Sequence, residues 1–204
     1  MEQKTLFSKD SLHEYLSNLK EEIRITVSNF SEKEINDGNI EFKISKLVTG
    51  KILKTPILFK EKITSEMEDA ELDGNPYTSA SLSRGKVKGK RIKLYVQFLG
   101  DSKLFVFRPS QFTSVHPNGS ISDNELLLSF EYSLHEDIAT KTKEDLAKEL
   151  SNIDRYLGWV KLEVEQYNAS LGSFINQLMA SKRQNIERDK KMINDLGFKP
   201  RGKE

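Results

Sequence analysis

The chain has 204 residues, of which 36% are apolar and 31% are charged. This length fits one large domain or two small ones and is enough to bury a core. Its 32 basic and 31 acidic residues leave a net charge of +1, which excludes a general electrostatic pull toward nucleic acid or acidic membranes. The absence of cysteine excludes disulfides, thiolate metal sites and a cysteine nucleophile.

Residues 1–55 are predicted to form an N-terminal helical segment. The first ten residues, MEQKTLFSKD, lack the apolar core of a signal peptide. Apolar residues then recur at steps of three or four, which predicts a helix over 9–30, and a second short helix is expected over 39–48. No window approaches eighteen consecutive apolar residues, so we expect a cytoplasmic protein with no membrane contact.

Residues 56–138 are predicted to form a small antiparallel sheet. Strands are expected over 57–64, 91–99, 104–107 and 125–134, and a charged loop over 65–90. In the second and fourth of these strands, alternate residues should share one face: Ile92, Leu94, Val96 and Phe98, and Leu126, Leu128, Phe130 and Tyr132. Turns are expected at Gly100-Asp101 and, as a tight hairpin, at Asn118-Gly119.

Arg108 stands where a predicted strand meets a proline, in 100-GDSKLFVFRPSQF-112. As a strand, this segment would place Phe105 and Phe107 on one face and Arg108 on the other, and Pro109 would end the ladder because it has no N–H. We therefore expect Arg108 to fix the edge of the sheet against a carboxylate of the C-terminal helix.

Residues 139–204 are predicted to form a long helix or a helical hairpin. Apolar residues there alternate steps of four and three, as in a coiled-coil heptad, at Leu146, Leu150, Ile153, Leu157, Val160, Val164, Tyr167, Leu171, Phe174 and Leu178. The stretch 168-NASLG-172 is the one place where the helix could break into a hairpin. The predicted fold class is therefore α+β.

A heptad seam of this length needs a surface to pack on. It could fold back on itself, pack on the sheet or form an oligomer. For the last case the predicted interface contains Leu150, Ile153, Leu157, Trp159, Val160, Val164, Tyr167 and Leu171, with Trp159 as an anchor. Packing within the chain remains open for the same residues.

A basic cluster lies in 84-RGKVKGKRIK-93. Its six cations could bind a phosphate backbone without sequence specificity: Arg84, Lys86, Lys88, Lys90, Arg91 and Lys93. The alternative is that the five acids of residues 66–73 neutralise the cluster in the folded chain.

No catalytic, metal or cofactor site is predicted. The three histidines, His13, His116 and His135, are scattered, and no G-x-S-x-G nucleophile motif is present. The glycines of 85-GKVKGK-90 have the wrong spacing for a phosphate-binding loop, which also needs Ser or Thr after its lysine.

Several segments resemble the N-terminal, non-catalytic region of bacterial restriction-endonuclease-like defence proteins. They are 98-FLGDSKLFVFRPSQFTSVHPNG-119, 125-ELLLSFEY-132, 153-IDRYLGWVKLEVEQYNASL-171 and 186-IERDKKMINDLGFKPR-201. In that family the catalytic carboxylates and lysine lie after the segment similar to 186–201, so the resemblance implies that this chain has no catalytic residue. It implies a regulatory, assembly or target-sensing module of an anti-phage system, either the front of a longer product or the companion of a separate nuclease or defence subunit.

Overall fold

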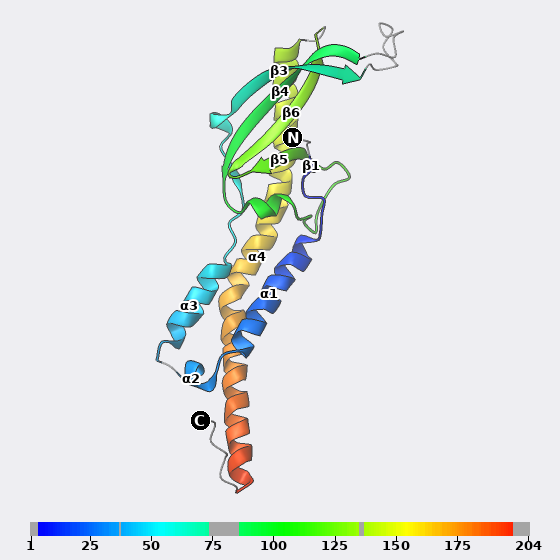
Figure 1. Ribbon diagram of the computed structural model, residues 1–204. Coiled ribbons are helices and arrows are strands. Elements are labelled where there is room, and N and C mark those ends of the chain that lie inside the picture. The colour runs from blue at the N-terminus through cyan, green and yellow to red at the C-terminus, as the bar shows by residue number, and fades with distance from the viewer. Residues whose placement is uncertain (1–3, 37, 74–85, 135–136, 198–204) are drawn as a thin grey trace. The chain divides into compact units, whose positions relative to one another are not determined.

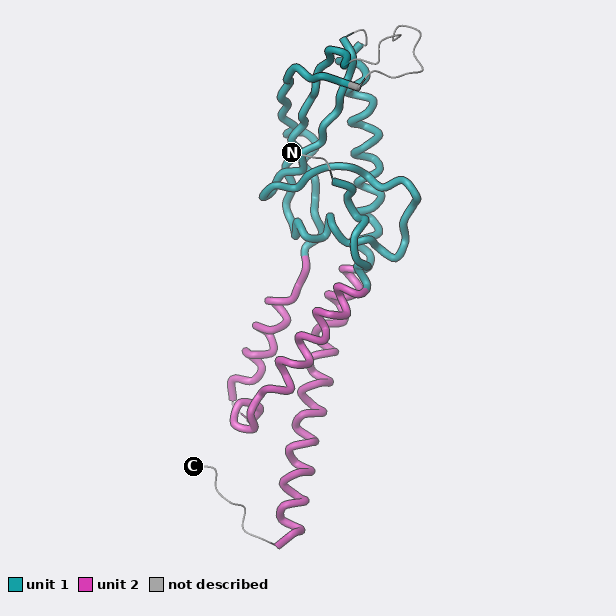
Figure 2. The backbone as a smooth tube through the Cα atoms, turned by 45° about the vertical axis from the view of Figure 1, so that its right-hand side comes forward, with its two compact units in different colours: residues 1–13, 54–163 teal, residues 14–53, 164–204 magenta. Residues whose placement is uncertain are grey.

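The computed structural model describes residues 4–36, 38–73, 86–134 and 137–197. The chain divides into two compact units that cut across the predicted segments: residues 1–13 with 54–163, and residues 14–53 with 164–204 (Figure 2). One helix, α4 (Ile138–Asp195), contributes its first part to unit 1 and its second part to unit 2. The predicted α+β class is confirmed.

Unit 1 contains one antiparallel sheet. Its long strands are β3 (Thr64–Asp73), β4 (Lys86–Leu99) and β6 (Glu125–Ser133). The shorter β5 (Asn118–Ser122) pairs with β6, and β1 (Lys4–Thr5) pairs with β5. On the other side, β3 and β2 (Ile57–Leu58) both pair with β4. The central strand β4 therefore sets the register of three neighbours.

The buried face of this sheet is the one predicted from alternation. Ile92, Leu94, Val96 and Phe98 of β4 are buried, as are Leu126, Leu128 and Tyr132 of β6. The first part of α4 lies against the sheet (Figure 1). The Tyr132 hydroxyl donates a hydrogen bond to Asp145 of α4 over 2.9 Å.

An aromatic cluster joins α4 to the rest of unit 1. The ring of Tyr156 stacks on Phe7 at 5.1 Å, and Phe105 contacts both Phe7 at 5.7 Å and Phe98 at 5.0 Å. Phe7 is fully buried and has a φ of 50°, a left-handed conformation that is rare for a bulky residue. Packing of the ring on both sides compensates for that backbone conformation.

The predicted strand over 104–107 is wrong. Residues Ser102–Phe105 form a 3₁₀ turn, η2, closed by a bond from the Leu104 amide to the Asp101 carbonyl over 3.0 Å. The consecutive residues Leu104 and Phe105 are both fully buried. A strand turns successive side chains to opposite faces, whereas a 3₁₀ turn can bury both.

Two further predictions in this unit are corrected. Residues 65–73 belong to strand β3 and 86–90 to β4, while 74–85 lie outside the described residues. Asn118 and Gly119 begin strand β5 and do not form the hairpin, which turns at Asp123 with a φ of 50°. A Cβ at Gly119 would lie 2.8 Å from the end of the buried Leu126 side chain, so a larger residue there would need that side chain to shift.

Unit 2 consists of helices. Helices α1 (Leu12–Ser28) and α3 (Ile40–Lys51) agree with the two predicted helices. The short helix α2 (Glu32–Ile35) between them was not predicted. Both α1 and α3 lie beside the second part of α4 (Figure 1). Among the described residues, no helix is long and apolar enough to cross a membrane.

Polar contacts fix the direction of α1 along α4. The Lys20 ammonium lies over the rings of Tyr167 at 5.9 Å and Phe174 at 5.6 Å. Farther along, Lys182 donates to the Ser28 carbonyl over 2.8 Å. Since residue numbers rise together in the two helices, α1 runs parallel to α4.

Helix α4 does not break at 168–172. Asn168, expected to weaken the helix, uses its side chain to bind the chain that leaves α3: its amide donates to the Leu53 carbonyl over 2.8 Å and accepts from the Leu53 amide over 3.1 Å. The helix thus continues, and the polar residue satisfies a part-buried backbone segment outside it.

Replacing Asn168 with alanine should lower the free energy of unfolding by about 1–3 kcal/mol, because both polar groups of Leu53 lose their partner. Gly172→Ala should raise it by about 0.5–1 kcal/mol, since a Cβ there meets nothing within 4 Å and alanine favours the helix. Urea titrations followed by circular dichroism measure both changes. A stabilising Asn168→Ala would contradict the role assigned to the amide.

Candidate functional site

The basic cluster is placed opposite the acidic run. Strand β3 pairs with β4 in a register that sets Glu66 against Lys93, Glu68 against Arg91, and Asp69 against Lys90. The same register sets Glu71 against Lys88 and Asp73 against Lys86. The sixth predicted cation, Arg84, lies outside the described residues.

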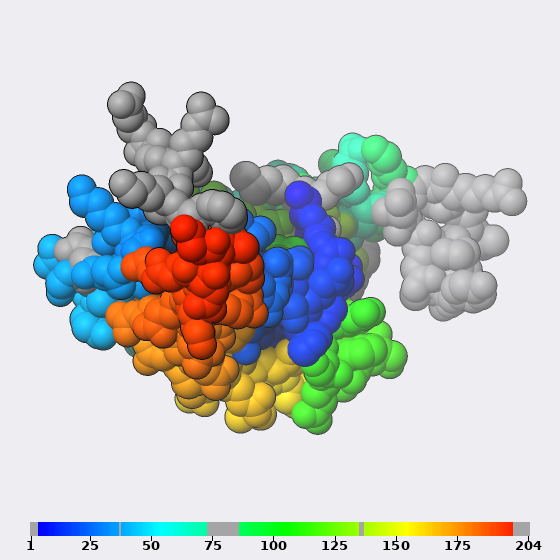
Figure 3. All heavy atoms as spheres, turned by 90° about the horizontal axis from the view of Figure 1, so that it is seen from below, coloured from blue at the N-terminus to red at the C-terminus, as the bar shows by residue number. Residues whose placement is uncertain are grey.

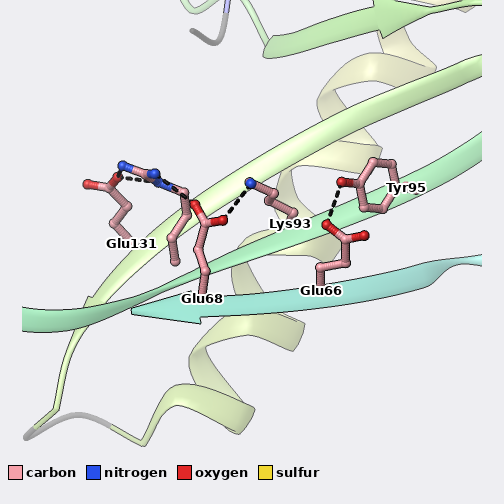
Figure 4. Close-up of polar contacts among 6 residues, drawn as sticks. Glu66, Glu68, Lys93, Tyr95 and Glu131 are labelled. Atoms are coloured by element: carbon pink, nitrogen blue, oxygen red, sulfur yellow. Dashed lines mark hydrogen bonds and ion pairs between the residues drawn. The ribbon is translucent and has the colours of Figure 1, made fainter. Parts of the chain in front are cut away.

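Ion pairs cross three strands on the solvent-exposed face of this sheet (Figure 4). Glu68 of β3 accepts from Arg91 over 2.8 Å and from Lys93 over 2.7 Å. Arg91 also pairs with Glu131 of β6 over 2.7 Å, and the Tyr95 hydroxyl donates to Glu66 over 2.8 Å. We call these six residues the charge ladder: Glu66, Glu68, Arg91, Lys93, Tyr95 and Glu131.

The ladder shifts the proton affinities of its members. Hydrogen bonds from Lys93 and Arg91 lower the pKa of Glu68, and the bond to Glu68 raises the pKa of Lys93. On the opposite face, a hydrogen bond from Lys90 over 2.5 Å lowers the pKa of Asp69. Lys86 pairs with Glu71 over 3.1 Å.

This pairing reduces the positive potential that the cluster offers to a phosphate backbone. Four of the five described cations of the cluster, Lys86, Lys90, Arg91 and Lys93, contact a carboxylate. A phosphate would have to displace these carboxylates, and the acids that remain would repel it. The geometry therefore favours the second interpretation of the cluster, a structural ladder.

The heptad seam of α4 is covered by the chain itself. Seven of the eight residues predicted for an interface are buried in the single chain: Leu150, Ile153, Leu157, Val160, Val164, Tyr167 and Leu171. After Leu171 the buried positions are Ile175 and Met179, one residue beyond the predicted Phe174 and Leu178. A straight helix of 3.6 residues per turn drifts from a 3.5-residue repeat in this direction. These seven side chains are therefore occupied by packing within the chain.

A loop over residues 106–117 runs along the first part of α4. Side chains of the helix bind its backbone: Glu163 accepts from the Ser110 amide over 2.6 Å, and Tyr156 donates to the Thr113 carbonyl over 2.9 Å. At the end of the loop, Glu149 accepts from the Asn118 amide over 2.6 Å. Figure 3 shows the atoms of this loop, in green, beside those of α4, in yellow.

The same loop presents a row of stacked rings. The Arg108 guanidinium lies 5.0 Å above the ring of Phe112, and Phe112 stacks on His116 at 6.2 Å. His116 in turn contacts Tyr156 at 5.5 Å, which meets Trp159 edge-on at 5.1 Å. Arg108 is exposed, and its side chain lies over the Phe112 ring of its own loop. The predicted partner of Arg108 was instead a carboxylate of α4. The carboxylate of Glu163 takes the backbone amide of Ser110.

The exposed part of this row is apolar and cationic. Phe112 is 50% exposed and Val115 66% exposed. Trp159 is half-buried and is joined to Phe112 through the rings of His116 and Tyr156. We call Arg108, Phe112, Val115, His116 and Trp159 the Arg108 surface. Of these residues, only Trp159 was predicted for an interface, while Arg108 was expected at the edge of the sheet. Phe112 and Val115 were not predicted, because their only signal in the sequence is that they are bulky residues in a polar loop.

The Arg108 surface has the composition of a protein-binding site. Arginine and tryptophan are enriched among the residues that dominate binding energy, and arginine and aromatic residues are enriched at interfaces, although other charged residues are depleted at interface centres. In the described residues, no group of three potential metal ligands lies together. A cavity of about 480 Å³ lies between β1, η2 and β5, with Lys4 and Lys9 as its charged lining residues.

Comparison with known proteins adds no relative. The chain matches no protein-family model, no curated protein and no solved structure. The relationship to restriction-endonuclease-like defence proteins therefore stays a prediction from the sequence.

Two tyrosines of α4 test how the loop is bound. Tyr156→Phe should lower the free energy of unfolding by about 1 kcal/mol or more, because the Thr113 backbone loses its partner. Tyr167→Phe should raise it by about 1 kcal/mol, because the buried Tyr167 hydroxyl has no hydrogen-bond partner among the described residues. Burial also raises the pKa of Tyr167 to about 12. Equal effects of the two changes in urea titrations would contradict this assignment.

The charge ladder predicts a small dependence of stability on pH and salt. Because the pKa values of Glu68 and Asp69 are lowered in the folded chain, their contribution is present above the ordinary values of 4.5 and 3.8 and is lost as pH falls below them. Glu68→Gln should lower the melting temperature by a few degrees, about 4 °C at most, near pH 7 at low salt. This difference should vanish at about pH 3 or at about 1 M salt. The control is Glu61→Gln, at an exposed residue outside the ladder; an equal loss there would refute the role of the ladder.

Proposed function

We propose that this chain is a non-catalytic module that acts by binding a protein partner through the Arg108 surface. The observation that supports this function is the exposure of Arg108, Phe112 and Val115 on one loop, together with the ring contacts that lead from Phe112 to the single tryptophan of the chain. Exposed apolar side chains of this size around a cation typically mark protein interaction sites.

The loop is preorganised for binding. Its backbone is bound at Ser110, Thr113 and Asn118 by side chains of one helix. A partner would therefore pay little conformational entropy to order it, which leaves more of the contact energy as affinity. Rigid presentation on a helix also favours one binding geometry.

We place this module in a bacterial anti-phage nuclease system, as a regulatory, assembly or target-sensing part. The support for this setting is the resemblance of the quoted segments, one of which contains the Arg108 surface up to His116. The partner is then a nuclease or another defence subunit, or a second copy of this chain. A cytoplasmic location goes with this setting.

The alternative function, nucleic-acid binding, is tested by a different experiment. If residues 86–93 bound DNA, replacing Lys86, Lys88 and Lys90 with glutamate should weaken binding and flatten its salt dependence. Because carboxylates of β3 already contact Lys86 and Lys90, we expect no binding of duplex or single-stranded DNA at about 0.15 M salt. Salt-dependent binding that the three substitutions abolish would favour the alternative over our proposal.

The proposal is tested by removing the apolar part of the Arg108 surface. Phe112→Ser with Val115→Ser should weaken self-association, or binding to a partner purified with the tagged chain, by about tenfold or more. Sedimentation and titration calorimetry measure the two cases. Met67→Ser removes a side chain of similar exposure, 64%, from strand β3 and is the control.

The single tryptophan reports where the partner binds. Binding at the Arg108 surface should shift the emission of Trp159, which lies at that surface. A folded double variant that binds as tightly as the wild type, or binding without any change in Trp159 emission, would contradict the proposal.

A further inference from the structure

Unit 2 contains a groove that the proposed function does not use. It lies between the chain after α1, helix α2 and helix α3, and has a volume of about 380 Å³. Its apolar residues are Phe30 and Leu47, both half-buried, with Gly50 beside them. A volume at the lower end of the range of ligand pockets suits one or two large side chains.

Three lysines and one glutamate line the same groove. Lys43 pairs with Glu34 over 3.5 Å, and its ammonium lies 6.0 Å from the Phe30 ring centre. Lys51 pairs with Glu22 of α1 over 2.6 Å. Lys46 is exposed, and the three lysines with their paired carboxylates, Glu34 and Glu22, carry a net charge of +1. The groove is thus apolar inside, and Lys46 supplies the net positive charge at its rim.

Helix geometry explains why these residues share one face. Lys43, Leu47 and Gly50 stand at steps of four and three, and Lys46 lies next to them on the same side of α3. Phe42, which is 71% exposed, lies one turn before Lys46 and extends the apolar surface beyond the groove.

Gly50 leaves this face of α3 open. A Cβ at Gly50 would meet nothing within 4 Å, so packing inside the chain does not require glycine there. Its φ is not positive, so the backbone does not require glycine either. In a helix, glycine costs about 0.5–1 kcal/mol relative to alanine, and one use of it is to let another chain approach the backbone closely.

We propose that this groove binds an acidic, amphipathic peptide segment of a partner protein. One or two apolar side chains of the segment occupy the space over Phe30, Leu47 and Gly50. Carboxylates that flank them meet Lys46 and the neighbouring lysines. Charge complementarity selects this partner: a basic segment would be repelled by the rim, and an apolar floor of this size offers a nucleic acid no row of phosphate contacts.

The first experiment is a peptide selection on the full chain. A random twelve-residue library displayed on phage is selected against the wild type and depleted against Gly50→Phe, whose ring fills the groove. Enriched peptides should combine Leu, Phe or Trp with Asp or Glu. No enrichment over Gly50→Phe, or enrichment of basic peptides, would overturn the proposal.

The second experiment measures one enriched peptide, labelled with a fluorophore, by polarisation. Lys46→Glu should weaken its binding by about tenfold or more, and Gly50→Phe should abolish it. Lys46→Arg keeps the charge, so it should bind like the wild type. Lys103→Glu reverses an exposed charge of unit 1 and controls for net charge.

Two outcomes distinguish other occupants. If sodium decanoate competes fully with the peptide and binds the wild type alone with the same dependence on Lys46, the groove takes small amphiphilic anions and the peptide proposal fails. If Lys46→Glu and Lys103→Glu weaken binding equally, the attraction is unspecific and the groove is not the site. Circular dichroism of each variant shows that it is folded, and Trp159 emission separates this groove from the Arg108 surface.

Discussion

The structure depends on one continuous helix that has a buried apolar stripe along most of its length. Leu150, Ile153 and Val160 pack in unit 1, and Leu171 and Ile175 are buried in unit 2. Burying side chains of this kind is the main favourable term in folding, at roughly 1.5–3 kcal/mol for each one. Because α4 contributes buried side chains to both units, a break in this helix would remove packing contacts from each of them.

The polar positions of α4 are as important as the apolar ones. Glu149, Tyr156 and Glu163 bind the backbone of the 106–117 loop, and Asn168 binds Leu53. In each case a helix side chain satisfies backbone groups of a loop or of the end of a strand. This arrangement allows a long irregular loop to stand in one conformation and to present Arg108 and Phe112 at the surface.

The two candidate binding surfaces differ in character. The Arg108 surface is a set of exposed rings around a cation, whereas the groove at Lys46 is a small apolar space with a positive rim. The charge ladder is a third kind of surface, in which the ionisable groups pair with one another across neighbouring strands.

The sequence alone determined the α+β class, helices α1 and α3, the faces of β4 and β6 and the apolar stripe of α4, because each follows from a local period of two or of about 3.6 residues. It could not determine that residues 104–105 form a 3₁₀ turn or that the acidic run is a strand, since both depend on partners distant in the chain. The position of Arg108 could not be predicted from the sequence either. Its stacking on Phe112 occurs in a loop whose backbone is bound by side chains of α4. Which of the stripe, the loop and the basic cluster face solvent was decided only by tertiary packing, because burial depends on contacts between segments far apart in sequence.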